Sequence, residues 1–214
     1  MINLPSVTLL AVSSIRISET IMALLYCCEG INFNSVKLIS HEIPKTLPSN
    51  IKFEQCRKIN NILDYNQIVF KELYPYVKTS HCLLIQYDGW VIHPELWDDS
   101  WLDYDFCGAP WPIVEGHYLT LTGERIRVGN GGISLRSRNL LELPEKYHLS
   151  LVQDRGYYNE DGNICVYWRK EFLEHGIKYA PVEVAARFSY ENSVPENIGL
   201  KTFAFHKHIT KENL

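Results

Sequence analysis

Apolar runs alternate with a helical pattern in the N-terminal part of the chain. Apolar residues dominate the segment from Ser6 to Ser13, which predicts a buried strand. A helix is predicted next, with Ser18 as its N-cap, apolar residues through Leu25 and an end at Gly30. The segment from Ser35 to Ser40 is predicted to be a second strand. Strand, helix and strand at this spacing favour a right-handed βαβ unit within a mostly parallel sheet.

The middle of the chain is predicted to hold a loop, a helix and a further strand. Two prolines predict a loop over residues 41–50. The spacing of apolar residues predicts a helix over residues 64–77. An apolar run then ends at Gln86 and predicts another buried strand, with a short helix after it over residues 94–102.

The last part of the chain continues this mixture of elements. Residues 113–128 are predicted to form a loop or hairpin, followed by a strand or turn through Leu135 and a short helix near Leu140. Helical spacing returns at Ile164 and ends at Gly176. No repeat, low-complexity tract or linker interrupts the pattern, so we expect the 214 residues to form a single α/β domain.

Composition limits the partners that we expect. Hydrophobic residues make up 46% of the chain and charged residues 21%, and the formal net charge is −4. A negative net charge without a long basic stripe argues against broad electrostatic binding of nucleic acid. No stretch approaches the roughly 20 apolar residues of a membrane-spanning helix. We therefore expect neither a nucleic-acid partner nor a membrane span.

The cysteines and the N-terminal segment bear on the cellular compartment. Six cysteines are scattered through apolar contexts, and none has the CxxC spacing of a zinc site. The apolar run from Val7 to Val12 is too short for the core of a signal peptide, and no basic residue precedes it. These features predict a cytoplasmic protein with reduced, buried thiols.

The stretch CLLIQYDGW, from Cys82 to Trp90, is the most informative one. Its apolar part predicts a strand, and this strand ends on Gln86, Tyr87 and Asp88. Ligands of α/β proteins bind at the carboxyl ends of the strands. A carboxylate in that place can hold a divalent cation against phosphate oxygens. An Asp-Gly turn that closes a hairpin is the alternative, and this stretch alone does not decide between them.

A glycine-rich stretch, GNGGISLR from Gly129 to Arg136, is the second candidate. Glycines permit positive φ angles and let a ligand approach the backbone closely. Asn130 and Ser134 add polar groups, and the Arg136 guanidinium can donate two hydrogen bonds to an anion. Asn-Gly is also an ordinary hairpin signal. The spacing matches neither a P-loop nor a dinucleotide fingerprint.

Two further groups lie toward the C-terminus. Asp161, within NEDG, comes at the start of a predicted helix, where a carboxylate ordinarily caps free N–H groups. The same carboxylate could act as a general base if it faces a cleft. His206 and His208 would share one face of a strand and could line one site, with packing beside the neighbouring aromatic residues as the alternative.

Four motifs, QYDGW, FCGAPW, GNGGISLRSR and NEDG, occur in this order and together resemble a family of small glycosyltransferase domains. The resemblance implies a GT-A-like fold, an α/β/α sandwich with a mostly parallel central sheet that binds a nucleotide-sugar. It covers the chain from Thr8 to His206. It leaves open that the chain is the N-terminal glycosyltransferase domain of a larger chlorella-virus protein. In that case further domains would belong to the same polypeptide, and the location would be the host cytoplasm.

The resemblance implies a metal site for Mn²⁺ or Mg²⁺. Asp88 matches the final acid of a DxD-like motif, which joins the metal to the donor diphosphate. His206 matches a C-terminal histidine that completes the metal shell. Gln86 stands where the first acid of the motif would be, which implies weaker metal binding.

The resemblance also implies how a nucleotide-sugar donor is bound. The end of the first strand matches the pocket of the nucleotide base, and the glycine pair matches the backbone that approaches the donor sugar. The residues thus assigned to the donor are Ser13, Arg16, Gln86, Tyr87, Asp88, Gly131, Gly132 and Arg136. Trp90, Trp111 and Tyr158 could offer apolar faces to sugar C–H groups, with core packing as the alternative.

These assignments predict an inverting transfer of a sugar from a nucleoside diphosphate sugar, with UDP favoured, to an acceptor hydroxyl on a glycan or glycoprotein. Asp161 matches the acid of the family's xED motif and would be the catalytic base. A non-catalytic module that binds nucleotide-sugars is the first alternative, because the first acid of the metal motif is absent. A sugar nucleotidyltransferase is the second, although the segment after the first strand lacks the glycines of such enzymes.

Overall fold

The computed structural model describes residues 1–153 and 159–207. A six-stranded sheet lies at its centre, with the strand order β3-β2-β1-β4-β7-β6. These strands are β1 (Ile2–Val12), β2 (Ile31–Ser40), β3 (Ile51–Gln55), β4 (His81–Ile85), β6 (Phe106–Gly108) and β7 (Ile133–Ser137). β1 pairs in parallel with β2 and β4, and β2 with β3, whereas β7 is antiparallel to both β4 and β6. The predicted α/β class with a mostly parallel central sheet is confirmed.

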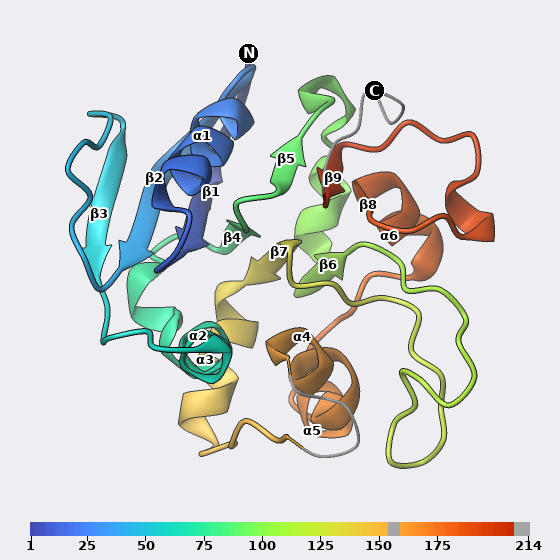
Figure 1. The fold of residues 1–214 in the computed structure, drawn as a ribbon. Helices are drawn as coiled ribbons and strands as arrows, with labels where there is room; N and C mark the ends of the chain where they lie inside the picture. The colour runs from blue at the N-terminus through green and yellow to red at the C-terminus, as the bar shows by residue number, and fades with distance from the viewer. Residues whose placement is uncertain (154–158, 208–214) are drawn as a thin grey trace.

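A smaller sheet and a set of mostly short helices complete the described structure (Figure 1). The second sheet has the order β5-β9-β8, from β5 (Gly89–Val91), β8 (Ser189–Tyr190) and β9 (Ala204–His206). The α-helices are α1 (Ile17–Cys27), α2 (Ile62–Gln67), α3 (Arg138–Lys146), α4 (Glu160–Gly162), α5 (Arg169–Glu174) and α6 (Val182–Phe188). The π-helices are η1 (Ile68–Glu72) and η5 (Asn163–Tyr167), and the 3₁₀-helices are η2 (Tyr74–Tyr76), η3 (Pro94–Leu96), η4 (Asp99–Asp103) and η6 (Pro195–Asn197).

The central sheet is covered on both faces, because consecutive residues of a strand point to opposite sides. Leu9 of β1 belongs to the same apolar cluster as Leu24 of α1. Leu10, the next residue of β1, clusters instead with Val69 of η1. Helical segments therefore pack on both faces of the sheet, which gives the predicted α/β/α layers. Figure 1 shows α1 passing in front of β1 and β2. Among the described residues, no helix is both long enough and apolar enough to span a bilayer.

Two local predictions differ from the structure near the ends of β1 and β4. Ser18 is not the N-cap of α1: that position is Arg16, whose φ of 51° lies in the left-handed region and whose side chain makes no capping hydrogen bond. The pair Asp88-Gly89 does not close a hairpin either. Within residues 1–153 and 159–207, β4 pairs with β1 and β7 alone, whereas β5 pairs with β9 in the second sheet. The Asp-Gly turn therefore carries the chain from one sheet to the other.

Two other differences concern the segment between β2 and β4. β3 was not predicted, because it is short and mostly polar, and only its first residue, Ile51, is buried. The helix predicted over residues 64–77 is present as three consecutive pieces, α2, η1 and η2. Asn61 caps its start by accepting hydrogen bonds from the backbone N–H groups of Leu63 and Asp64.

The order of the strands creates a crevice next to β1. The chain passes from β1 to β2 on one side, and later returns to place β4 on the other side. Such a topological switch point leaves the carboxyl ends of the two central strands uncovered, and it is the usual ligand site of open α/β sheets. Ser13 follows β1 and Gln86 follows β4 directly, so both residues lie at this crevice.

Candidate active site

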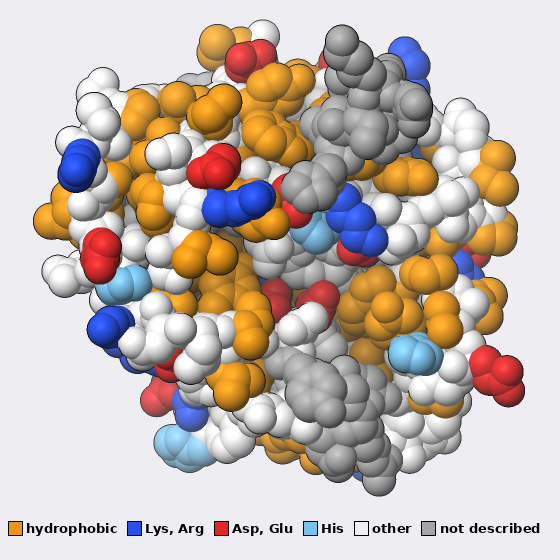
Figure 2. Space-filling view, viewed as in Figure 1, with side chains coloured by type: hydrophobic (Ala, Val, Ile, Leu, Met, Phe, Trp, Pro, Cys, Tyr) orange, Lys and Arg blue, Asp and Glu red, His pale blue; other side chains and the backbone are white. Residues whose placement is uncertain are grey.

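Three cavities adjoin one another at the carboxyl edge of the central sheet. The first cavity has a volume of about 480 Å³, the central cavity about 250 Å³ and the third cavity about 680 Å³. The first and central cavities share Ile62, Tyr65 and Gln86, and the central and third cavities share Trp111, Asn159, Asp161 and Glu191. Because neighbouring cavities share walls, they form one cleft. Figure 2 shows acidic side chains and a histidine near the centre of this face, between areas of hydrophobic side chains.

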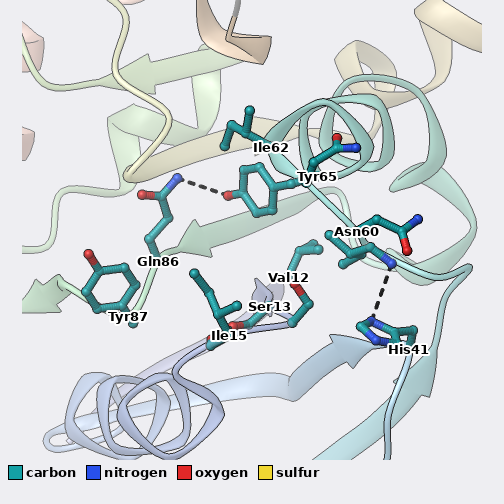
Figure 3. Close-up of a pocket in the computed structure, with 12 residues that line it drawn as sticks. Val12, Ser13, Ile15, His41, Asn60, Ile62, Tyr65, Gln86 and Tyr87 are labelled. Atoms are coloured by element: carbon teal, nitrogen blue, oxygen red, sulfur yellow. Dashed lines mark hydrogen bonds between the residues drawn. The ribbon is translucent and has the colours of Figure 1, made fainter.

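The first cavity has a mostly apolar lining and lies between the turn that follows β1 and the start of α2. Ile15 precedes α1 and Ile62 begins α2, and they are 70% and 62% exposed although both line the cavity. Figure 3 shows Ile15 and Tyr87 on one side of this cavity and Ile62 and Tyr65 on the other. Two exposed isoleucines across a gap provide apolar surfaces for a flat ring.

Gln86 separates the first cavity from the central one. Its Nε2 donates a hydrogen bond to the hydroxyl of Tyr65 over 3.0 Å (Figure 3). Its backbone N–H donates to the carbonyl of Gly132 at 2.8 Å, which ties the end of β4 to the start of β7. Gln86 therefore lies at the end of β4 and lines both cavities.

Ser13 and Arg16 shape the turn between β1 and α1. The Ser13 hydroxyl donates to the carbonyl of Ile15 at 2.5 Å and accepts a hydrogen bond from Thr20 at 3.1 Å. Ser13 lines the first cavity, although its hydroxyl already holds this turn. The exposed guanidinium of Arg16 lies 4.6 Å from the centre of the Tyr87 ring, within the range of a cation–π contact. Arg16 thus lies at the rim of the first cavity, over a residue that lines it.

Asp161 lies where the central and third cavities meet. One oxygen, Oδ2, accepts a hydrogen bond from the backbone N–H of Gly131 at 2.9 Å, and Oδ1 accepts from that of Gly162 at 2.7 Å. Burial raises the pKa of Asp161, and the charge of Glu160 raises it further, while these two N–H groups and Arg136 lower it; the pKa is about 7. A carboxyl group with such a pKa can exchange a proton near neutral pH.

Arg136 and Glu160 form a buried ion pair beneath Asp161. Arg136 is 0% exposed and Glu160 3%, and Arg136 Nη2 lies 2.9 Å from Glu160 Oε1. Arg136 Nε also donates to the hydroxyl of Ser134 at 2.9 Å. Arg136 lines none of the three cavities, so this placement directs its charge at Glu160 rather than at a bound anion.

His206 lies between two carboxylates at the side of the central cavity. Its Nε2 is 3.4 Å from Asp88 Oδ1, and its Nδ1 is 3.5 Å from Glu191 Oε1. Burial lowers the pKa of His206, but the hydrogen bonds and charges of Asp88 and Glu191 outweigh this effect and raise it to about 9. Burial likewise raises the pKa of Glu191, while His206, Lys207 and Asn130 lower it to a net value below the usual one.

The predicted pair Asp88 and His206 is thus brought together, from the end of β4 and from β9. Within the described ranges, no group of three or more His, Cys, Asp or Glu side chains is arranged to hold a metal ion. The two residues predicted to bind a metal therefore lie beside each other as an ion pair.

The glycine-rich segment serves packing between elements of the protein. A Cβ atom on Gly131 would lie 2.0 Å from Glu160 Oε1, and one on Gly132 would lie 2.0 Å from Nε2 of His206. The positive φ angle expected here belongs to Asn130, at 69°, and to none of the three glycines. Asn130 Oδ1 accepts a hydrogen bond from the N–H of Gly132 at 2.7 Å. The predicted glycines line the central cavity, but their side-chain space is filled by acid and imidazole groups.

The third cavity is lined mostly by polar atoms and extends outward from Asp161. Its wall includes Trp111 and Tyr118, whose rings stack with centroids 4.3 Å apart and planes at 12°. Trp111 thus lines the cleft while its own side chain is buried. Trp90 is placed differently: it lies on β5, where its ring makes an edge contact with Tyr26.

Several residues of the cleft were not predicted from the sequence. Tyr65, Glu160 and Glu191 all line the central cavity; Tyr65 and Glu191 come from segments without a motif, whereas Glu160 belongs to NEDG but was given no role there. Glu160 directly precedes Asp161, the predicted base, so its place in the NEDG motif could have identified it as a residue of the cleft. Tyr158, which could offer an apolar face to a sugar, and His208, which could line one site together with His206, lie outside the described residues.

Comparisons with known proteins give a family and a similar structure. A family model described as protein of unknown function (DUF5672) matches residues 47–206, so the chain belongs to this family. A comparison with curated proteins finds no match. The chain is similar to a solved structure described as a glycosyltransferase involved in the glycosylation of the major capsid of PBCV-1. The identity is 15%, the match covers 97% of this chain and 95% of the other, and the TM-score is 0.49.

Proposed function

We propose that this DUF5672 member is a glycosyltransferase. It moves a sugar from a nucleoside diphosphate sugar, with UDP as the favoured nucleotide, to an acceptor hydroxyl. The observation that carries the proposal is the position of Asp161. Its carboxyl group, with a pKa of about 7, lies at the junction of two cavities in the cleft at the switch point of the sheet. A general base must lie within hydrogen-bond reach of the acceptor hydroxyl, and this junction is where acceptor and donor would meet.

The first cavity fits the nucleoside end of such a donor. A base ring would lie between Ile15 and Ile62, at the end of β1, with the Gln86 amide at the passage to the central cavity. Arg16 and Lys207 are the exposed cations nearest to the ends of β1 and β9 in sequence. Cations at the mouth of the cleft would favour the approach of a diphosphate.

Asp88 and His206 are the residues that would hold Mn²⁺ or Mg²⁺. Their 3.4 Å separation fits two neighbouring ligands of one ion, which lie about 3 Å apart when each is about 2.1 Å from the metal. His206 would have to give up its proton, so metal binding would weaken as the pH falls. Such an ion would neutralise negative charge on the leaving diphosphate. With only two protein ligands, the remaining positions would belong to the diphosphate and to water.

In the proposed reaction, Asp161 accepts the proton of the acceptor hydroxyl as its oxygen attacks the anomeric carbon. The bond from that carbon to the diphosphate breaks on the opposite side, which inverts the anomeric configuration. The hydrogen bonds from Gly131 and Gly162 fix both carboxylate oxygens, so that the base keeps one orientation. The buried Arg136–Glu160 ion pair lies beside Asp161, and its charges act on the pKa of that carboxyl group.

Asp161→Asn tests this proposal. The substitution keeps an acceptor for one backbone N–H but cannot take up the proton. With a set of UDP-sugars and Mn²⁺, we expect donor hydrolysis to fall by roughly 100-fold or more, while thermal stabilisation by UDP stays near that of the wild type. Glu174→Gln, an exposed acid of α5, is the matched control and should hydrolyse donors normally. Hydrolysis by Asp161→Asn at the wild-type rate would contradict the assignment.

A nucleotide-sugar-binding module without turnover is the second candidate. It is supported by Gln86, which replaces an acid, and by the small number of metal-ligating groups in the described ranges. This candidate predicts that UDP raises the melting temperature of the wild type while no UDP-sugar is hydrolysed.

A further inference from the structure

The third cavity has the chemistry of a binding site for a hydroxyl-rich molecule. It is the largest of the three, at about 680 Å³, and its lining is mostly polar, whereas that of the first cavity is mostly apolar. Glu191, Asn192 and Lys207 contribute polar groups to its wall. These three also contact one another, with Lys207 Nζ 3.1 Å from Asn192 Oδ1 and 3.3 Å from Glu191 Oε1.

An aromatic pair gives the same cavity one apolar wall. Trp111 is only 5% exposed, and its indole packs so closely on Gly129 that a Cβ atom there would lie 2.0 Å from the ring. Tyr118 stacks on Trp111 and remains half-buried. Trp111 is therefore held in place by its packing on Gly129. Tyr118, which lies on the same long segment between β6 and β7, stacks on the Trp111 ring.

The backbone of Tyr118 is strained. Its φ of 54° lies in the left-handed region, which an aromatic residue adopts only at a cost in free energy. Strained residues persist where the surrounding structure holds them, and they gather at binding sites. Burial and the charges of Glu191 and Asp161 raise the pKa of the Tyr118 phenol, in keeping with a position close to both carboxylates.

We infer that Tyr118, backed by Trp111, forms the sugar-binding wall of an acceptor subsite, which takes a pyranose ring of a glycan. This inference rests on the proposed function and adds the class of the acceptor. Carbohydrate rings have an apolar C–H face and a rim of hydroxyls, and the cavity offers an aromatic wall and polar groups to match them. Asp161, on the border of this cavity, would then receive the proton of the hydroxyl that attacks.

The test measures binding of simple sugars to the whole chain. A panel of methyl glycosides of common hexoses, deoxyhexoses and pentoses is mixed with the protein, and saturation-transfer NMR records which sugar protons receive magnetisation. We expect at least one methyl glycoside to be saturated, more strongly when aromatic protein protons are irradiated than when methyl protons are. Tyr118→Ala should weaken its affinity by about 3- to 10-fold, and Tyr118→Phe should keep it.

His148→Ala is the matched control, because His148 has the same φ of 54° but is exposed and lines none of the three cavities. It should bind the methyl glycoside like the wild type. Saturation without preference for aromatic irradiation overturns the inference even if Tyr118→Ala fails to fold. So does a lack of binding by every glycoside, or binding of a serine-containing peptide in their place. UDP binding and UDP-sugar hydrolysis by the wild type are measured separately. Their absence would refute the proposed function, whereas glycoside binding tests the sugar-binding wall by itself.

Discussion

The buried pair of Arg136 and Glu160 leads to a prediction about stability. Arg136→Met would remove a guanidinium that is 0% exposed and leave a Glu160 carboxylate that is 3% exposed without its cation. Breaking a buried ion pair from one side costs about 3–5 kcal/mol. For a chain of this length, each kcal/mol lowers the melting temperature by about 2–4 °C, so the expected decrease is about 6–20 °C.

Replacing both partners should cost much less than the two single substitutions together. Among the described residues, Nη1 of Arg136 has no hydrogen-bond partner, so the native pair is incompletely satisfied. Buried pairs of this kind are often replaced by apolar residues without loss. In Arg136→Met/Glu160→Met, no buried charge of the pair remains, and we expect a coupling energy of about 2–3 kcal/mol between the two positions.

Urea denaturation of the wild type, both single variants and the double variant measures these free energies. The exposed pair of Lys170 and Glu174, 3.8 Å apart on one turn of α5, is the control. Lys170→Met should cost no more than about 0.5 kcal/mol. Additive effects of Arg136→Met and Glu160→Met, or an Arg136→Met cost as small as that of the control, would refute the reasoning.

Three further predictions concern the cleft. Asp161 must be ionised to act as a base, so turnover should rise with pH through the Asp161 pKa of about 7. Because the charge of Glu160 raises the pKa of Asp161, Glu160→Gln should move this rise in turnover to lower pH. Gly132→Ala places a Cβ atom 2.0 Å from Nε2 of His206, so it should abolish any Mn²⁺-dependent gain in UDP affinity, measured by calorimetry. Arg16→Ala should weaken UDP and UDP-sugars by similar factors in the same assay, and a loss confined to the sugar conjugates would place Arg16 away from the nucleotide.

The sequence predicted the parts of the fold that depend on local patterns. Apolar runs located β1, β2 and β4, because central parallel strands are buried on both faces and need continuous apolar residues. An edge strand has no such requirement, so β3, with one buried residue, left no signal. The start of α1 was misplaced because Ser18 is a good capping residue by type. The N-cap is instead Arg16, whose backbone lies in the left-handed region.

The candidate site was predictable where a residue lies within a recognised sequence motif. It was not predictable where the fold brings distant segments together. Asp88 and Asp161 could be proposed from their own neighbours in sequence. Glu191 could not, because it follows a short strand at the edge of the second sheet, and only the fold brings it to the cleft beside His206. Tyr65 likewise enters the cleft through a helix whose pattern indicates only core packing.

The glycine-rich motif and the acidic motif depend on each other physically. Gly131 lacks a side chain where Glu160 needs space, and its N–H holds Asp161. Arg136, in the same motif, neutralises Glu160. A larger residue at Gly131 would therefore displace the acid that sets the charge beside the proposed base. Packing and charge around one carboxylate thus connect the order GNGG followed by NED. A motif that looks like a ligand-binding loop can act on the chemistry of a site by placing its acids.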